Sequence, residues 1–287
     1  MPNAWTPPDL ALSSALRVFA TQEKTQASEH IHPLHRHFAL RLVLEGGFLP
    51  DEITPRPPMR VETRKKRQFL IFDESAQVDG EQTILGGLKT KKVDVVVTKP
   101  GIGPVLAMSF KGTFNAFRNL TNRMEEAGGD CTNLHIMYPG LVYGFFHVLR
   151  GNEEGTAGLA ANDIAVKADG QVIESILRYQ QALLGLTGRR LVRDDLTRYE
   201  AVAIALVEMS PVRLGQVIEN FPRAEPALHP SAFLPSLLTI YDLRYPYFAA
   251  SVGSLERHVW SPESPVFEAM GDEATWETRF GFLPRVE

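Results

Sequence analysis

Residues 91–126 read KKVDVVVTKPGIGPVLAMSFKGTFNAFRNLTNRMEE, and this stretch decides the fold. Two apolar runs, residues 93–97 and 105–110, are separated by a turn rich in glycine and proline. Runs of this kind on either side of such a turn predict an antiparallel β-hairpin. Asp94 lies in the first strand and Lys111 ends the second, so the hairpin is expected to bring an acid and a lysine to one edge.

The surroundings of Asp94 allow two interpretations. Side chains alternate between the faces of a strand, so Asp94 would share an otherwise apolar face with Val96. A carboxylate on such a face is unfavourable unless it is paired or bound to a metal. It could form a structural ion pair near the start of the strand with Lys92 or Lys111. Alternatively, a carboxylate beside a lysine suits a divalent metal and an activated water, which is the chemistry of phosphodiester hydrolysis.

A helix is expected directly after the hairpin. Its apolar residues recur at spacings of three or four: Phe114, Phe117, Leu120, Met124 and Ala127. The glycine pair at residues 128–129 is expected to end this helix as a C-cap. Glu125 lies beside the apolar stripe. It is either a solvated helix acid near Arg118 or a carboxylate that reaches a metal at the end of the hairpin.

The pattern of Asp94, Ser109, Lys111 and Glu125 on strand, strand and helix resembles the PD-(D/E)xK nuclease superfamily, which includes many restriction endonucleases. Asp94 matches the metal-binding acid of that family and Lys111 its motif lysine. Ser109 departs from the usual acid. In this respect the chain is similar to the Ser-x-Lys subgroup of type II restriction endonucleases, in which the following helix supplies the missing carboxylate. Glu125 matches that position, and Glu126 is an adjacent candidate.

The resemblance covers about residues 36–149. It implies an α/β fold with a restriction-endonuclease-like core, in which a mixed β-sheet is flanked by helices, and with additional C-terminal elements. It also implies a Mg²⁺ ion held by Asp94 and Glu125. Mn²⁺ would be able to substitute for Mg²⁺. Glu45 is a further candidate ligand or a surface acid at the end of a helix. Lys111 would orient or deprotonate the attacking water, and Ser109 would hold a metal-bound water or bond Glu125.

The activity that this resemblance implies is Mg²⁺-dependent endonucleolytic cleavage of double-stranded DNA in restriction or phage defence. Arg118 and Arg123 would contact phosphates. A homodimer is expected if both strands are cut. Two alternatives stay open. One is a non-catalytic DNA-binding or assembly subunit, for which the serine at position 109 argues, and the other is a DNA repair or mobile-element nuclease on the same fold.

Composition limits the choice of partners and compartment. The chain has 287 residues, a formal net charge of −4 and a single cysteine, Cys131. DNA binding must therefore rely on local basic patches such as residues 60–67, unless these are only a solvated face. One cysteine excludes an internal disulfide and a Cys-based zinc finger. The chain has no apolar run near 18 residues and does not begin like a signal peptide, so we expect a cytoplasmic protein without a membrane span.

Four histidines, His30, His32, His35 and His37, lie within eight residues. Their spacing fits no standard zinc pattern, so an exposed or interfacial cluster is favoured over a metal site or phosphate contacts.

The remaining pattern predicts one continuous domain. Residues 1–150 would hold the N-terminal helices and the nuclease core, and residues 151–287 would continue it for recognition or dimerisation. Further helices are expected at residues 10–20, 25–45 and 171–186. Further strands are expected at residues 68–72, 82–88, 132–138, 199–209 and 247–252, and residues 141–149 form either a buried strand or a short helix. Apart from residues 247–252, the proline-rich chain after residue 211 is expected to be irregular.

Overall fold

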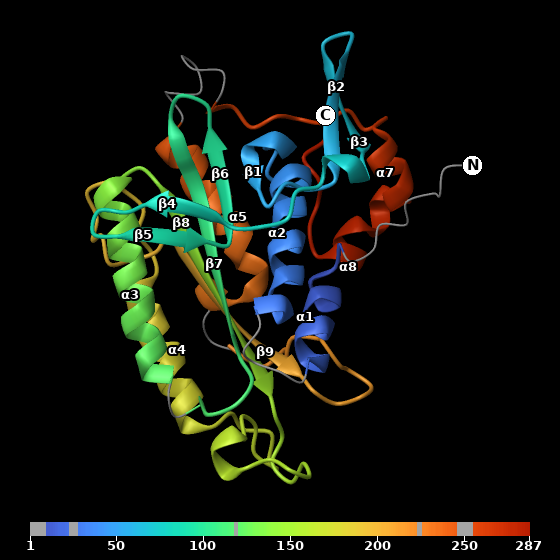
Figure 1. The fold of residues 1–287 in the computed structure, drawn as a ribbon. Helices are drawn as coiled ribbons and strands as arrows, with labels where there is room; N and C mark the ends of the chain where they lie inside the picture. The colour runs from blue at the N-terminus through green and yellow to red at the C-terminus, as the bar shows by residue number, and fades with distance from the viewer. Residues whose placement is uncertain (1–9, 23–27, 118–119, 223–225, 246–254) are drawn as a thin grey trace.

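A mixed five-stranded sheet occupies the centre of the molecule in the order β1-β6-β7-β8-β9 (Figure 1). The chain was analysed as a computed structural model, which describes residues 10–22, 28–117, 120–222, 226–245 and 255–287. The strands of the sheet are β1 (Ile53–Thr54), β6 (Val95–Lys99), β7 (Gly103–Thr113), β8 (Val142–Gly151) and β9 (Ala201–Glu208). The β1–β6 and β6–β7 pairs are antiparallel, and the β7–β8 and β8–β9 pairs are parallel. Parallel neighbours need a crossover, and α3 and α4 provide the two crossovers here.

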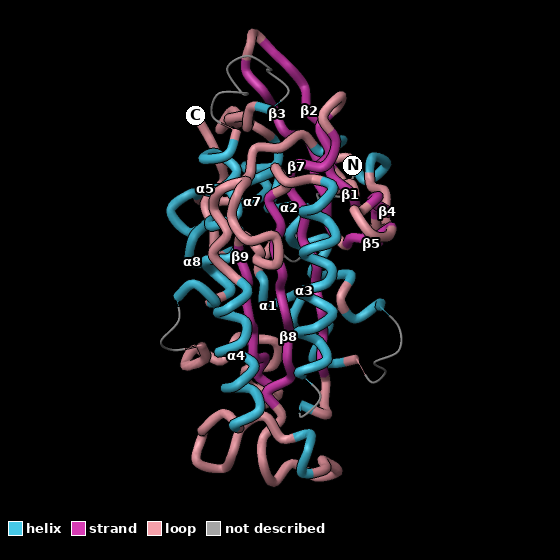
Figure 2. Tube along the Cα trace, turned by 90° about the vertical axis from the view of Figure 1, so that its left-hand side faces the viewer, coloured by secondary structure: helices cyan, strands magenta, loops and turns pink. Residues whose placement is uncertain are grey.

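Helices cover both faces of the sheet, as the two perpendicular views show (Figures 1 and 2). One face packs against α1 (Leu12–Thr21), α2 (His32–Leu44) and α5 (Pro230–Arg244), with α7 (Pro265–Met270) and α8 (Trp276–Phe280) beyond them. The other face packs against α3 (Leu120–Met137) and α4 (Glu174–Leu186). Each face has its own buried apolar cluster, so the molecule has the three layers of an α/β fold.

Two small hairpins lie outside the main sheet. The first, β2 (Met59–Arg64) and β3 (Arg67–Phe72), projects from the body of the molecule (Figure 1). The second, β4 (Gln82–Leu85) and β5 (Thr90–Val93), leads directly into β6. Short 3-10 helices connect several elements: Ser28–His30, Pro50–Glu52, Glu74–Ala76, Ala161–Asp163, Pro226–Leu228 and Glu273–Thr275.

The expected α/β class and its mixed sheet flanked by helices are confirmed. The hairpin of β6 and β7 is confirmed as well, with Val95 opposite Met108. Residues 141–149 belong to strand β8. The expected helices and strands elsewhere are present within a few residues of their bounds. The exceptions are both ends of α3, the region after residue 211 and the strand expected at residues 247–252, which lies outside the described residues. Phe114, expected on the apolar face of α3, precedes that helix and packs in the cluster on the opposite face of the sheet.

The expected end of the helix at residues 128–129 is wrong. Helix α3 continues through both glycines to Met137, so most of the strand expected at residues 132–138 belongs to its second half. The cause is burial, because Ala127, Cys131 and Leu134 lie on one face of the helix and pack into the core. Glycine lowers helix stability by about 1 kcal/mol relative to alanine, and tertiary packing outweighs that loss.

The region after residue 211, expected to be irregular, contains the fifteen-residue helix α5. Pro230 occupies its first turn, where a missing N–H group has no helical partner to lose. Pro235 lies inside the helix and is tolerated there.

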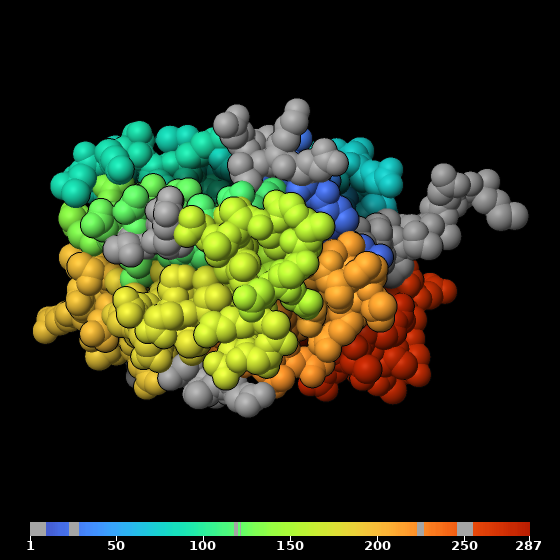
Figure 3. Space-filling model, turned by 90° about the horizontal axis from the view of Figure 1, so that it is seen from below, coloured from blue at the N-terminus to red at the C-terminus, as the bar shows by residue number. Residues whose placement is uncertain are grey.

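The segment that joins β8 to α4 lies on the surface of the molecule. Seen from below, this segment and α4 cover the middle of the surface, between N-terminal and C-terminal parts of the chain (Figure 3). None of the described helices is both long enough and apolar enough to cross a membrane.

Candidate functional site

Asp94 lies at the break between strands β5 and β6, at the edge where β7 approaches its end. Its carboxylate Oδ2 accepts a hydrogen bond from the backbone N–H of Phe110 at 2.6 Å. Val93 ends the outer hairpin opposite Gln82, and Val95 begins the main sheet opposite Met108. Asp94 therefore joins two sheets, and this bend turns its carboxylate toward α2 and the backbone of β7.

Burial dominates the electrostatics of Asp94. The desolvated environment raises its pKa from 3.8 to about 6, although the Phe110 N–H bond opposes that rise. The negative charge of Glu81 raises the pKa further, whereas the positive charges of Lys111 and Lys91 lower it. A carboxyl group with this pKa is mostly ionised at neutral pH.

The structural ion pair considered for Asp94 is not formed with Lys92. Lys92 instead pairs with Glu81 at 2.7 Å. The titratable side chain within 4.0 Å of the Asp94 carboxylate, among the described residues, is His35, whose Nε2 lies 3.8 Å from Oδ1. This separation is too long for a hydrogen bond.

Lys111 opens onto a surface hollow of about 490 Å³ beside this edge of the sheet. Among the described residues, no acidic side chain forms an ion pair with Lys111. The charged residues that line the hollow are Lys89, Lys91, Lys111, Arg123, Glu125, Glu126 and Asp130. Two of the acids are already paired, Asp130 with Lys91 and Glu126 with Arg123. Lys111 is thus a cation available to an anionic ligand.

Glu125 is on α3 and lines the same hollow as Lys111, with its side chain exposed. The expected bond from Ser109 to Glu125 is not formed, because Ser109 is buried and its hydroxyl is hydrogen-bonded to that of Tyr143 at 2.7 Å. Ser109 therefore helps to hold β7 against β8, and the structure gives it no contact with the hollow.

The structure does not bring Glu45 to this site. Glu45 follows α2 and forms an ion pair with Arg41 at 2.6 Å. It lies ten residues after His35, which at 1.5 Å per residue is about 15 Å along the helix. Glu45 as a ligand next to Asp94 is therefore corrected to an acid paired at the opposite end of α2.

The two expected phosphate contacts differ in outcome. Arg123 lies at the hollow, exposed and 3.0 Å from Glu126. Arg118 lies outside the described residues.

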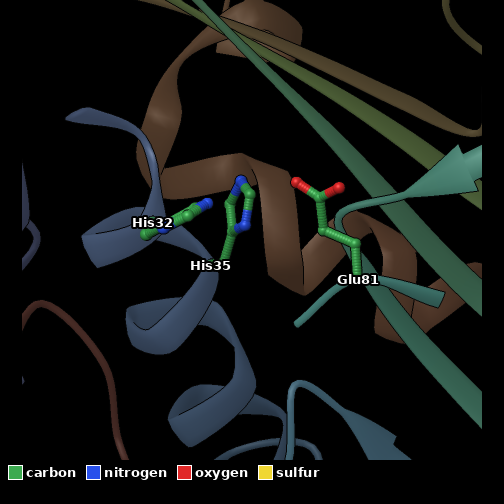
Figure 4. A group of neighbouring side chains, drawn as sticks. All are labelled: His32, His35 and Glu81. Atoms are coloured by element: carbon green, nitrogen blue, oxygen red, sulfur yellow. The ribbon is translucent and has the colours of Figure 1, made fainter. Parts of the chain in front are cut away.

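A second group of side chains, not expected as a site, lies beside Asp94. His32, His35 and Glu81 each offer a ligand atom, and these atoms lie within 4.8 Å of one another. Figure 4 shows the two imidazoles and the carboxylate turned toward one another. Burial lowers the pKa of His35 from 6.5 to about 3, so its imidazole is neutral. Burial raises the pKa of Glu81, but its hydrogen bond and ion pair with Lys92 outweigh that effect and leave the pKa lower than usual.

The expectation that the four histidines form an exposed or interfacial cluster is wrong. His30, His35 and His37 are buried, and His32 is partly exposed. The sequence signal that could have indicated this arrangement is the i, i+3 spacing of His32 and His35, which places both on one face of a helix. Glu81 has no such signal, because it reaches the histidines only through the packing of the β4–β5 hairpin.

Comparisons of the chain with protein-family models, with curated proteins and with solved structures gave no match.

Proposed function

We propose that this chain is a DNA endonuclease that hydrolyses phosphodiester bonds with the help of a divalent cation. The observation that carries the proposal is the position of Asp94 and Lys111 at one edge of an antiparallel strand pair. The two groups are close enough for the charge of Lys111 to lower the pKa of Asp94. A carboxylate and an unpaired lysine at one sheet edge suit a reaction in which a phosphate gains negative charge.

The order of elements supports the same proposal. Helix α2 precedes β1, β6 and β7, then α3 crosses over to β8, which is parallel to β7. The acid immediately precedes β6, the first strand of the central antiparallel pair, and the lysine is on β7, the second. This is the order of the PD-(D/E)xK nucleases that the sequence resembles, and a restriction-endonuclease-like core is therefore part of the proposal.

The hollow at Lys111 is suited to bind the substrate. Lys89 adds positive charge to Lys111 there, whereas Lys91 and Arg123 are paired with Asp130 and Glu126. Cationic side chains of this kind contact the phosphates of DNA without reading its sequence. In the proposed reaction Lys111 holds the scissile phosphate and stabilises the charge that develops on it. Asp94, mostly ionised at neutral pH, orients the reacting groups at the strand edge.

One of the three carboxylates expected to hold Mg²⁺ is not near Asp94. Mg²⁺ prefers oxygen ligands in octahedral geometry. Glu45 is at the far end of α2, and the imidazole of His35 lies closer to Asp94. Glu45 is therefore not part of the proposed Mg²⁺ set, and we assign no reaction step to that ion. Dependence on some divalent cation remains part of the proposal.

The test is cleavage of plasmid and phage DNA by wild-type protein and by Lys111→Met, with Mg²⁺, with Mn²⁺ or with EDTA. Cation-dependent cleavage that Lys111→Met loses by at least about 100-fold is expected, since charge-stabilising groups contribute factors of that size. Lys167→Met is the matched control, because Lys167 is exposed and does not line the hollow. Cleavage that Lys111→Met retains in full would refute the mechanism.

A second candidate is a DNA-binding subunit without catalysis. The observation in its favour is that Ser109, at the position of the usual acid, is buried and hydrogen-bonded to Tyr143, so this position offers no carboxylate to a metal. A gel shift of duplex DNA without cleavage, under every cation condition, would favour this candidate. A homodimer, expected for cutting two strands, is tested by sedimentation with and without DNA.

A further inference from the structure

We propose that His32, His35 and Glu81 form a binding site for one divalent transition-metal ion of the Zn²⁺ class. These residues come from two separate parts of the chain, helix α2 and the segment just before β4. Their ligand atoms lie within 4.8 Å of one another, and the side chains converge on one volume (Figure 4). The inference concerns ion binding alone and does not depend on the proposed nuclease activity.

The geometry is close to that of an occupied site. Bonds of about 2.1 Å in a tetrahedral site place neighbouring ligand atoms roughly 3.4 Å apart. The three atoms here need to approach by at most roughly 1.4 Å, which side-chain rotation at His32 and Glu81 can provide because both are partly exposed. A cavity of about 110 Å³ opens on His32, His35 and Glu81. This volume leaves space for an ion and a few waters, each of which takes about 30 Å³ in the liquid.

His35 provides the independent observation that points to a ligand. Its side chain is 3% exposed, and its Nε2 has no hydrogen-bond partner among the described residues. A buried polar atom without a partner is unfavourable and calls for an explanation. A metal ion satisfies the lone pair of a neutral imidazole. Oδ1 of Asp94 lies 3.8 Å from that nitrogen but does not belong to the three converging ligand groups.

The donors select the class of ion. Two imidazole nitrogens and one carboxylate suit zinc, iron, nickel or copper, whereas Mg²⁺ and Ca²⁺ prefer sites made of oxygen ligands. The ammonium of Lys92 contacts Oε2 of Glu81, so the other oxygen of this carboxylate can bind the ion. Lys92 itself is mostly exposed and can turn away.

The experiment is titration of metal-free protein with Zn²⁺ by calorimetry, and with Co²⁺ by visible absorption. Wild-type protein is expected to bind one equivalent of Zn²⁺, and tenfold excess Mg²⁺ is expected not to displace it. His32→Gln and Glu81→Gln are each expected to weaken Zn²⁺ binding by at least about 100-fold, because outer-shell partners alone contribute 10- to 100-fold. Both positions are partly exposed, so these variants are expected to fold.

Three controls make the result decisive. His229→Asn removes a histidine outside the site and keeps the cap of α5, and it is expected to bind Zn²⁺ normally. Lys92→Gln removes a competing positive charge and is expected to tighten binding. Lys111→Met is expected to bind Zn²⁺ normally even if it loses cleavage, so the two proposals can fail separately. Zn²⁺ binding that is absent from wild-type protein, or unchanged in both ligand variants, overturns the inference.

Discussion

Nε2 of His35 and Oδ1 of Asp94 are 3.8 Å apart, so the histidine–glutamate group and the acid–lysine edge are neighbours. Asp94 belongs to the proposed nuclease edge and His35 to the proposed metal site. The pair is therefore the point at which a change at one site is expected to affect the other.

Asp94→Asn is expected to abolish cleavage without loss of stability. Burial raises the pKa of Asp94 to about 6, so the folded state binds the proton more tightly than the unfolded state does. Stability therefore falls as pH rises from about 4 to 6, by at most about 3 kcal/mol. The neutral asparagine avoids this loss and can still accept the Phe110 N–H.

Thermal unfolding in EDTA tests this prediction. The variant should melt at the same temperature as wild-type protein or higher at pH 7, and the difference should vanish below pH 4. A clearly lower melting temperature at pH 7 would show that the carboxylate stabilises the fold instead.

His147 is expected to make the fold sensitive to acid. It is buried, hydrogen-bonded to the hydroxyl of Tyr179 and, at 2.9 Å, to that of Thr113. Burial, together with the charges of Arg123 and Lys111, lowers the pKa of His147 from 6.5 to about 3. Between these values the unfolded state binds more protons, so stability decreases as pH falls from 6.5 toward 3.

The measurement is urea unfolding of wild-type protein and His147→Gln across this pH range. The variant should be less stable at pH 7 but should lose less stability on acidification. Parallel curves for the two proteins would rule out His147 as a cause of acid sensitivity.

Glu200 is expected to be essential for folding. Its Oε1 accepts hydrogen bonds from Arg189 at 2.6 Å and Arg244 at 2.8 Å, and its Oε2 accepts the backbone N–H of Tyr143. Removing one member of a buried ion pair typically costs about 3–5 kcal/mol, because the remaining charge is buried without compensation. Glu200→Gln should therefore lower the free energy of unfolding by about that amount.

Glu174→Gln is the matched control. Glu174 pairs with Arg178 at 2.9 Å, but both side chains are exposed. Exposed i, i+4 pairs contribute about 0.3–0.5 kcal/mol, so this variant should be nearly as stable as wild-type protein. Equal effects of the two substitutions on denaturant unfolding would contradict the account of Glu200.

The β2–β3 hairpin is expected to contact DNA through its tip. Its arginines are paired, Arg60 and Arg64 with Glu62, and Arg67 with Glu263 and Glu287. The turn residues Lys65 and Lys66 have φ angles of 49° and 70°. A turn with positive φ at both central residues favours the sequence Asn-Gly, so lysine at these two positions lowers the stability of the hairpin.

Lys65→Asn combined with Lys66→Gly should raise stability by about 1 kcal/mol and weaken DNA binding. The slope of log K against log salt should become shallower by up to about 2, since each lost phosphate contact changes it by about 0.9. Replacing both lysines with glutamine is the control that removes charge but keeps the strained turn. It should weaken DNA binding without the gain in stability.

The sequence predicts the β6–β7 hairpin well because alternation, turn residues and apolar runs agree there. It fails where packing overrides local preference. A Cβ added at Gly128 or Gly129 would meet no atom within 4 Å, so neither glycine is required by space, and the helix passes through both. The sequence does not predict helix α5, because prolines such as Pro230 and Pro235 usually interrupt helices. Pro230 is nevertheless favourable in the first turn of a helix.

The site could be predicted only in part for a similar reason. Asp94 and Lys111 are linked by one hairpin, so the number of residues between them in the sequence determines how close they lie in the fold. Glu81 approaches His32 and His35 across more than forty residues, through the placement of a separate hairpin on α2. No local pattern encodes that contact. Ser109 looked like part of the site because its strand position is right, but its hydroxyl is satisfied by a tyrosine from the next strand.

The β4–β5 hairpin has a consequence for how this region tolerates change in length. Gln82 pairs with Val93 at its base, so Glu81 and Asp94 are the residues that immediately flank that pair. The distance between the two acids therefore depends on the Gln82–Val93 pair, and not on the ten residues that lie between Gln82 and Val93 in the sequence. A change of length near the far turn is expected to leave both carboxylates in place, but to release the turn from α3, where the Asn133 side chain accepts hydrogen bonds from the backbone N–H groups of Leu88 and Lys89.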